Sequence, residues 1–368
     1  EMLKKIVEIK TKVKMRKIVL LLFILSINLT FSQNKTEAEK LVNEGVAYHD
    51  KGDYDGAVNK YNKALELDKD NLLALAEKAF TLNSLKKYDE SISICKLAIE
   101  KHPKDNSLKN VYVTYGNALD ELKKTDEAFA VYDDGLKVFP EYYQLHFNKG
   151  ITYSSIRKYD EAILSFQQAI LINPKHASSN NAIARLEKMN GRKIPAILAF
   201  CRFLITEPQS ARAKENLNSL KELISANVKK TGENSVSVTI DSKMLSEDTK
   251  NGKPKENDFS STELISTMDV ALDFDEKNVN KTEVENFIRK FETICASLNE
   301  MKKKNYGFYW DVYAPYFIEM KKNNLIEPFA YIVYASSETK DVNEWLDKNQ
   351  KELDKFYDWS KNYKWKTN

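Results

Sequence analysis

Glycine and proline are scarce in this chain of 368 residues, which contains 10 glycines and 8 prolines. A fold made of many short strands needs these residues at its turns, so their scarcity argues against a β-rich protein. Charged residues make up 30% of the sequence. Few turn formers among many charged residues predict long helices joined by short turns, and we therefore expect an all-α fold.

Cysteine is scarce as well. Cys95, Cys201 and Cys295 lie far apart in the sequence, are odd in number, and belong to no Cys-x-x-Cys or Cys/His pattern. This spacing is not that of a zinc motif or of a disulfide framework. We interpret the three side chains as buried thiols, and we expect neither a metal site nor a cofactor.

An excess of charge of one sign is missing too. The formal charge of +3 arises in residues 1–32, which hold seven Lys or Arg and two Glu. The rest of the chain contains 50 basic and 52 acidic residues, a net charge of −2. Such a near-neutral chain lacks the basic footprint of a nucleic-acid-binding protein, and no nucleic-acid partner is expected.

The sequence also lacks the signatures of known catalytic sites. It contains no Gly-x-Ser-x-Gly, His-Glu-x-x-His, Walker or dinucleotide-binding pattern. The acidic pair Asp273 and Asp275 resembles the start of a calcium loop. However, Asn278 replaces the turn glycine and Val284 replaces the bidentate glutamate of such a loop. These observations predict a protein that is not an enzyme.

Residues 15–33 have the pattern of a secretory signal peptide. A basic start at 15–17 is followed by ten apolar residues, IVLLLFILSI, at 18–27. Thr30 and Ser32 then supply the small side chains that precede a cut before Gln33. An apolar run of this length is short for a membrane span, and an uncleaved anchor is the alternative interpretation.

We therefore expect residues 1–32 to consist of an upstream extension, 1–14, and a signal peptide that is removed. Export to the periplasm is the predicted localisation. No cysteine follows the apolar run, so the acylation site of a bacterial lipoprotein is missing. We expect no stable membrane anchor in the exported chain.

A repeat of about 34 residues runs from position 38 to position 208. In each of five units, small residues recur at three places where two antiparallel helices would cross. These positions are Gly45/Ala57/Ala64, Ala79/Ser91/Ala98, Gly116/Ala128/Gly135, Gly150/Ala162/Ala169 and Ala184/Ala196/Phe203. Helices approach closely only where side chains are small, and Phe203 is the single exception to the pattern.

These segments resemble tetratricopeptide repeats, with five units at 38–208. The resemblance implies a right-handed superhelical solenoid of about five helix pairs, closed by a capping helix at 209–230. Residues 231–258 are mostly polar and are expected to form a linker, with at most one weak strand at 236–240. A helical pattern returns at 259–368 and predicts a small helical C-terminal domain.

The resemblance also implies that the first helix of each unit lines a concave groove. The residues expected there have apolar, amide or basic side chains: His49, Phe80, Asn83, Asn117, Phe147, Ile151, Asn181 and Arg185. This mixture suits an extended peptide or a helix of a partner protein. The early units lack the lysines with which chaperone-binding members hold a terminal carboxylate. For Phe80 and Phe147, packing against the next unit is an equally simple interpretation.

All four tryptophans, Trp310, Trp345, Trp359 and Trp365, lie near the C-terminal end of the sequence. They form either the core of a small helical domain or a platform for a glycan or peptide. Two functions are therefore open. One is a non-catalytic periplasmic scaffold that binds a protein segment in the repeat groove. The other is an envelope glycan- or peptide-binding module that acts through the aromatic C-terminal domain.

We predict that the exported protein begins at Gln33, because the basic start, the apolar run and the two small residues together define the cut. N-terminal sequencing of protein recovered from the periplasm of an expressing bacterium measures this directly. A mature chain that begins at Met15 or earlier would contradict the prediction.

Overall fold

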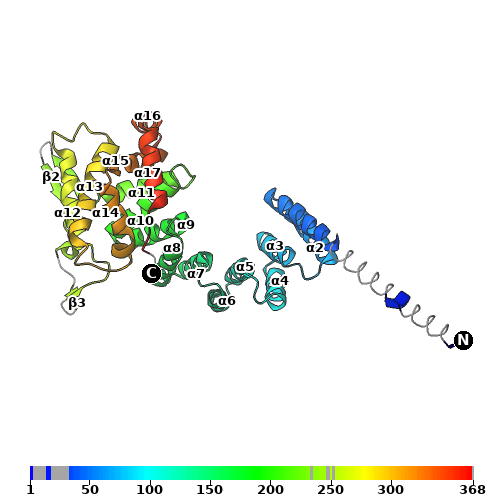
Figure 1. Cartoon of the computed structure of the whole chain (residues 1–368). Coiled ribbons are helices and arrows are strands. Elements are labelled where there is room, and N and C mark those ends of the chain that lie inside the picture. Colours follow the sequence, from blue (N-terminus) through cyan, green and yellow to red (C-terminus); the bar gives the residue numbers. More distant parts are fainter. Residues whose placement is uncertain (3–13, 18–32, 233–234, 246–248, 251–252, 367–368) are drawn as a thin grey trace. The chain divides into compact units, whose positions relative to one another are not determined.

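The computed structural model describes residues 1–2, 14–17, 33–232, 235–245, 249–250 and 253–366, most of which are helical (Figure 1). The predicted apolar run and most of the predicted cut site fall on residues 18–32, which lie outside the described residues. In the part that is described, no helix has the length and apolar character needed to cross a membrane.

The chain forms two compact units, Glu1–Thr152 and Tyr153–Asn368. The boundary falls inside helix α7, Tyr143–Ser155, and not in the polar segment 231–258 that the sequence suggested as a linker. The reason lies in the second unit, where the C-terminal elements pack against the last repeats.

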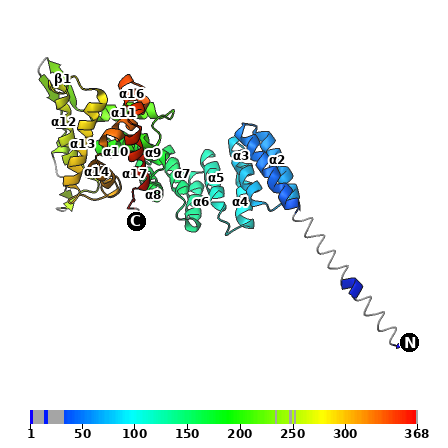
Figure 2. The same cartoon turned by 45° about the horizontal axis from the view of Figure 1, so that its top comes forward.

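The first unit is a series of antiparallel helices. Residues 33–50 are helical. The following helices are α2 Tyr54–Leu67, α3 Leu72–Ser84, α4 Tyr88–Lys101, α5 Leu108–Glu121, α6 Thr125–Val138 and the start of α7. From α2 to α5, each helix packs against the helix that follows it, as Figure 2 shows, and α3 also contacts α5. The predicted helix pairs are confirmed.

The turn within each helix pair uses the same backbone conformation. Gly52, Lys86, Lys123, Arg157 and Gly191 all have positive φ, between 60° and 80°. These positions are separated by 34, 37, 34 and 34 residues, which is the period of the small-residue pattern. Only two of the five are glycine, so the left-handed turn could not be recognised from residue type alone.

Close packing at the helix crossings explains the small residues. A Cβ atom on Gly116 would overlap the ring of Tyr132, and one on Gly45 would overlap the ring of Tyr61. Both tyrosine rings are completely buried. A larger side chain at either crossing would therefore have to displace a ring from the core.

The second unit continues the helix pairs and then adds further elements. Its helices after α7 are α8 Tyr159–Ile172, α9 Ala177–Met189, α10 Lys193–Thr206, α11 Ala213–Ser225, α12 Ser260–Val270, α13 Glu283–Met301, α14 Ala314–Lys322, α15 Ile326–Val333, α16 Lys340–Lys348 and α17 Gln350–Asn362. Short helical turns are η1 Ser242–Met244, η2 Ala271–Phe274, η3 Tyr309–Tyr313 (a π-helix) and η4 Ala335–Ser337.

The segment expected to be a capping helix and a linker differs from the prediction. Helix α11 ends at Ser225, and Asn227 then adopts a positive φ of 73°, so the chain leaves the helix earlier than expected. Strand β1, Val228–Gly232, pairs with β2, Ser235–Val238, in an antiparallel hairpin. Strands β3, Thr249–Lys250, and β4, Lys253–Pro254, form a second, shorter hairpin.

Helix α10 is buried on all sides. Every residue from Lys193 to Ile205 is buried, because α12, η3 and α15 contact this helix in addition to α9 and α11. Phe203, which departs from the small-residue pattern, is a completely buried residue of this helix, and the guanidinium of Arg212 lies over its ring. The region 259–368 is helical as predicted, but it is continuous with the last repeats and does not form a separate unit.

We expect Ala162→Leu to destabilise the protein by about 1–3 kcal/mol through overpacking, because Ala162 on α8 is completely inaccessible to solvent. The exposed Lys158, just before the same helix, provides the control, and Lys158→Ala should change stability little. Urea denaturation followed by circular dichroism measures both. Equal midpoints for Ala162→Leu and the parent would show that this site tolerates bulk.

Candidate functional site

The first unit contains a groove of about 480 Å³ between the first helices of three successive pairs. Helix α3 supplies Leu73, Glu77 and Phe80, residues 106–114 form the adjoining wall, and Gln144 comes from the start of α7. Leu73 and Phe80 are large apolar side chains that are 48% and 50% exposed. The groove therefore combines an apolar floor with polar and charged edges.

His49 holds Phe80 in place. The two rings stack with centroids 5.0 Å apart, and His49 Nδ1 lies 2.8 Å from the hydroxyl of Thr81. One face of Phe80 is thus covered by His49, while half of the side chain stays exposed in the groove. Packing against the next repeat does not account for the exposed half of the Phe80 side chain.

Two of the predicted amide side chains form hydrogen bonds within the first unit. Asn83 Nδ2 donates to the carbonyl of Thr114 at 2.9 Å and so joins α3 to α5. Asn117 Oδ1 accepts a hydrogen bond of 2.8 Å from the buried Tyr132. The side-chain oxygens of Asn83 and Gln144 are buried acceptors that lack a hydrogen-bond partner among the described residues. Both oxygens are inaccessible to solvent, so they are not open to a segment bound in the groove.

The other predicted groove residues divide between the two units. Phe147 and Ile151 lie on α7 in the first unit, and Ile151 is 42% exposed while Phe147 is half-buried. Asn181 and Arg185 lie on α9 in the second unit, where Asn181 is buried and Arg185 pairs with Glu215 of α11 at 2.9 Å. The inclusion of these two in a peptide groove stays a prediction.

Leu73 and Glu77 were not among the predicted residues. Leu73 lies seven residues before Phe80, on the same face of α3, so the spacing already contained a signal for it. Glu77 is half-buried, and burial raises the pKa of its carboxyl. The nearby Asp50 adds to this rise in pKa and His49 opposes it.

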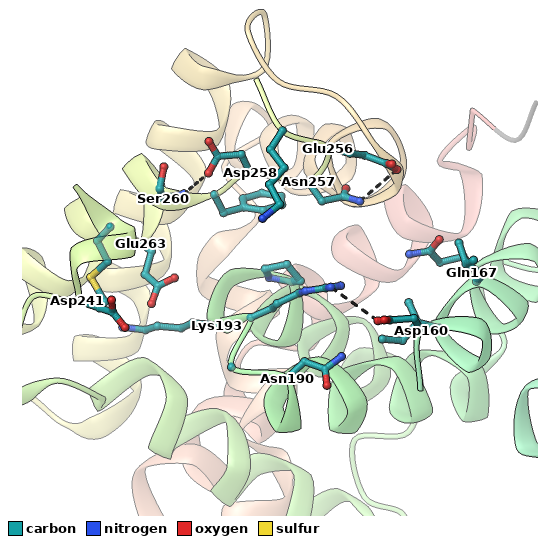
Figure 3. A pocket seen from close by; sticks show the side chains of 18 residues that line it. Asp160, Gln167, Asn190, Lys193, Asp241, Glu256, Asn257, Asp258, Ser260 and Glu263 are labelled. Atoms are coloured by element: carbon teal, nitrogen blue, oxygen red, sulfur yellow. Dashed lines mark hydrogen bonds and ion pairs between the residues drawn. The ribbon is translucent and has the colours of Figure 1, made fainter. Parts of the chain in front are cut away.

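A second cavity, of about 520 Å³, lies in the second unit (Figure 3). Its polar groups are largely engaged by one another. Arg192 pairs with Asp160, Asp258 accepts from the backbone N–H of Ser260 at 2.9 Å, and Asn257 donates to Glu256. These contacts, one ion pair and two hydrogen bonds from neutral donors, indicate no particular ligand.

Next to this cavity, two tyrosines of η3 join the C-terminal region to α9. The hydroxyl of Tyr309 donates to the completely buried carboxylate of Glu187 at 2.5 Å, and that of Tyr313 donates to Asn180 at 2.5 Å. Burial raises the pKa of Glu187, while Tyr309 and Arg192 oppose that rise. The contacts of Glu187 and Asn180 are structural.

The tryptophans mainly serve packing. Trp310 is completely buried and stacks on Phe259 with centroids 4.3 Å apart. The other three are partly buried. Trp345 stacks on Tyr331 at 4.1 Å, and Trp365 stacks on Tyr316 at 5.0 Å. This pattern is that of a core extending to the surface, not of an open aromatic platform.

The residues that were considered as metal ligands or reactive groups in the sequence make other contacts. Asp273 pairs with Arg289 and Lys290. The three cysteines are buried free thiols, and burial raises the pKa of Cys95 to about 12. Over the described ranges, no three His, Cys, Asp or Glu side chains gather as metal ligands would.

Comparison with known families identifies the helix pairs. A family described as "TPR repeat" matches residues 45–85, and one described as "Tetratricopeptide repeat" matches residues 143–176. Both matches fall on repeats that have the small residues at their helix crossings. The chain contains tetratricopeptide repeats.

Characterised proteins with the same repeats are similar over part of this chain. "Protein STIP1 homolog" of Dictyostelium discoideum is 29% identical over 38% of this chain, and the match covers 30% of that protein. "Hsp70-Hsp90 organizing protein" of Triticum aestivum is 27% identical over 47% of this chain, again covering 30% of its own length. The chain thus matches less than a third of each of these relatives.

Solved structures are similar to about half of this chain. A thermophilic repeat protein of Thermus thermophilus is 22% identical, with a TM-score of 0.44, over 50% of this chain and 98% of that one. The type IV pilus biogenesis factor PilW is 21% identical, with a TM-score of 0.41, over 51% of this chain and 90% of its own.

We expect Tyr309→Phe to destabilise this tetratricopeptide-repeat protein by about 1–3 kcal/mol, because the buried Glu187 loses a hydrogen-bond donor. Tyr306 lies three residues earlier and is 50% exposed, so Tyr306→Phe should have little effect. Thermal unfolding of the two variants measures the difference. Similar melting temperatures would show that the Tyr309 hydroxyl contributes nothing.

Proposed function

We propose that this tetratricopeptide-repeat protein is a non-catalytic scaffold that binds an extended segment of a partner protein in the groove of its first unit. The observation that carries the proposal is the pair Leu73 and Phe80, half exposed beside a groove of about 480 Å³. Exposed large apolar side chains in a concave site are typical of a surface that a ligand covers.

The physical basis is burial of these two side chains together with pairing of polar groups. Removing apolar surface from water contributes about 25 cal/mol per Å². An extended segment also carries backbone N–H and C=O groups, which can form hydrogen bonds with polar side chains that line the groove, such as Asn106 and Asn110. Apolar anchors would supply affinity, and backbone hydrogen bonds would fix the position of the segment.

The comparisons support a protein-binding role at a coarse level. One relative is named for organising two other proteins, but the match covers 30% of it, and its partners are not transferred to this chain. The terminal-carboxylate clamp of chaperone-binding members is also not proposed. At the matching positions the first unit has Glu39, Val42, Asn43 and Val46 instead of lysines.

The signal-peptide pattern at 15–33 supports export, and we propose the periplasm as the place where the scaffold acts. The absence of a cysteine after the apolar run favours a chain without a lipid anchor. A glycan-binding role of the C-terminal aromatics receives less support, because Trp310 is completely buried and the other tryptophans stack on neighbouring rings.

We expect Phe80→Ala to weaken binding of a groove ligand by about tenfold or more, since truncating a buried anchor often costs about 2 kcal/mol. Peptides selected from a random display library against the chain from Gln33 onward serve as ligands, and fluorescence anisotropy measures their affinity.

Leu164→Ala is the matched control, because Leu164 is 60% exposed but lies in the second unit. The variants are made in the whole chain, since ending it near Lys230 would uncover the buried helix α10. Selected peptides that bind Phe80→Ala and the parent equally would show that the groove is not the binding site. Loss of binding in Trp345→Ala instead would favour the aromatic region.

A further inference from the structure

The groove of the first unit holds a carboxylate between its two apolar side chains. Glu77 lies four residues after Leu73 and three before Phe80 on α3, so the three side chains share one face of this helix. All three line the groove. A segment that covers Leu73 and Phe80 must therefore also cover Glu77.

Glu77 has no cation to pair with. Throughout the described residues, no Lys or Arg forms an ion pair with it; of the two neighbours that affect the pKa of its carboxyl, His49 lowers that pKa and Asp50 raises it. Covering an unpaired carboxylate with an apolar or acidic segment would be unfavourable, because its water would be lost without replacement. A cationic side chain in the segment would compensate for that loss.

Lys109 also lines the groove, but its positive charge does not remove the preference for a cationic side chain in the segment. Lys109 comes from α5, and its ammonium lies 5.3 Å from the centre of the Tyr142 ring, where it makes a cation–π contact. Its charge is thus already in contact with an aromatic face, whereas that of Glu77 is not compensated. Burial raises the pKa of Glu77, as expected for a carboxyl that is partly removed from water.

We propose that the segment held in this groove carries a Lys or Arg side chain close to its apolar anchor, so that Glu77 binds the cation while Phe80 and Leu73 bind the apolar group. This inference rests on the proposed function and specifies the chemistry of the partner. It also distinguishes this groove from one that binds an acidic tail, since Glu77 repels a carboxylate.

The spacing of the two contacts defines the expected sequence. Glu77 and Phe80 are about 4.5 Å apart along the helix axis, at 1.5 Å per residue. In an extended segment, side chains on the same side are two residues and about 7 Å apart. The basic residue should therefore lie two positions from the apolar one, on the same side of the segment.

The test is a selection of random displayed peptides against four forms of the chain from Gln33 onward. These are the parent, Glu77→Gln, Lys109→Gln and Phe80→Ala. Glutamine keeps the shape of Glu77 and removes its charge, and Lys109→Gln removes the opposite charge from the same groove. Circular dichroism melting confirms that each form is folded.

The expected result is enrichment of Lys or Arg two positions from an aromatic or aliphatic residue on the parent and on Lys109→Gln. On Glu77→Gln the apolar preference should stay and the basic preference should disappear. An enriched peptide should bind Glu77→Gln about three- to tenfold more weakly than the parent. Changing the basic residue of the peptide to Gln should cause a similar loss that is not additive with Glu77→Gln.

Two other results would overturn the inference in different ways. An apolar preference without a basic one, or a basic preference that survives in Glu77→Gln, would reject the role of Glu77 and leave the proposed function standing. Failure to enrich any sequence, or the same sequences on Phe80→Ala, would reject the groove itself and the inference with it.

Discussion

The close crossing of paired helices at Gly, Ala and Ser residues is the contact on which the rest of the molecule depends. Where Gly116 meets Tyr132, there is no room for even a methyl group, and the distance between the two helices is fixed by that contact. Because the same crossing recurs in each repeat, the first helices of successive repeats lie side by side, as α3 and α5 do. The groove that holds Phe80 is a consequence of this spacing.

The last helix pair, in the second unit, departs from the pattern of small residues at the helix crossing. Phe203 takes the place of a small residue, and the helix that carries it is enclosed by α12, η3 and α15. Tyr309 and Tyr313 supply hydroxyl donors for Glu187 and Asn180, so that polar groups of α9 are satisfied beneath the C-terminal elements. The last repeat and the C-terminal region are thus one core.

The repeat architecture could be predicted from the sequence because its cause is local. Small residues at fixed spacing determine how one helix meets the next, and the five turns with positive φ follow the same period. Phe80 could be placed in the groove for the same reason. The enclosure of α10 could not be predicted, since it depends on contacts between residues more than a hundred positions apart, such as Glu187 and Tyr309. The importance of Glu77 was also hidden, because a glutamate on a helix is usually solvated, and only its burial beside two apolar side chains makes it unusual.

The enclosure of α10 has a consequence for assembly. An open array of helix pairs ends in a face that is complementary to the face at its other end, and such arrays can in principle stack head to tail into filaments. Here the C-terminal elements α12, η3 and α15 pack against α10, the second helix of the last pair, so among the described residues this helix is not open to another molecule that would continue the stack. Further repeats could be added during evolution only upstream of this pair. The covered end therefore sets a fixed limit to the length of the array on one side.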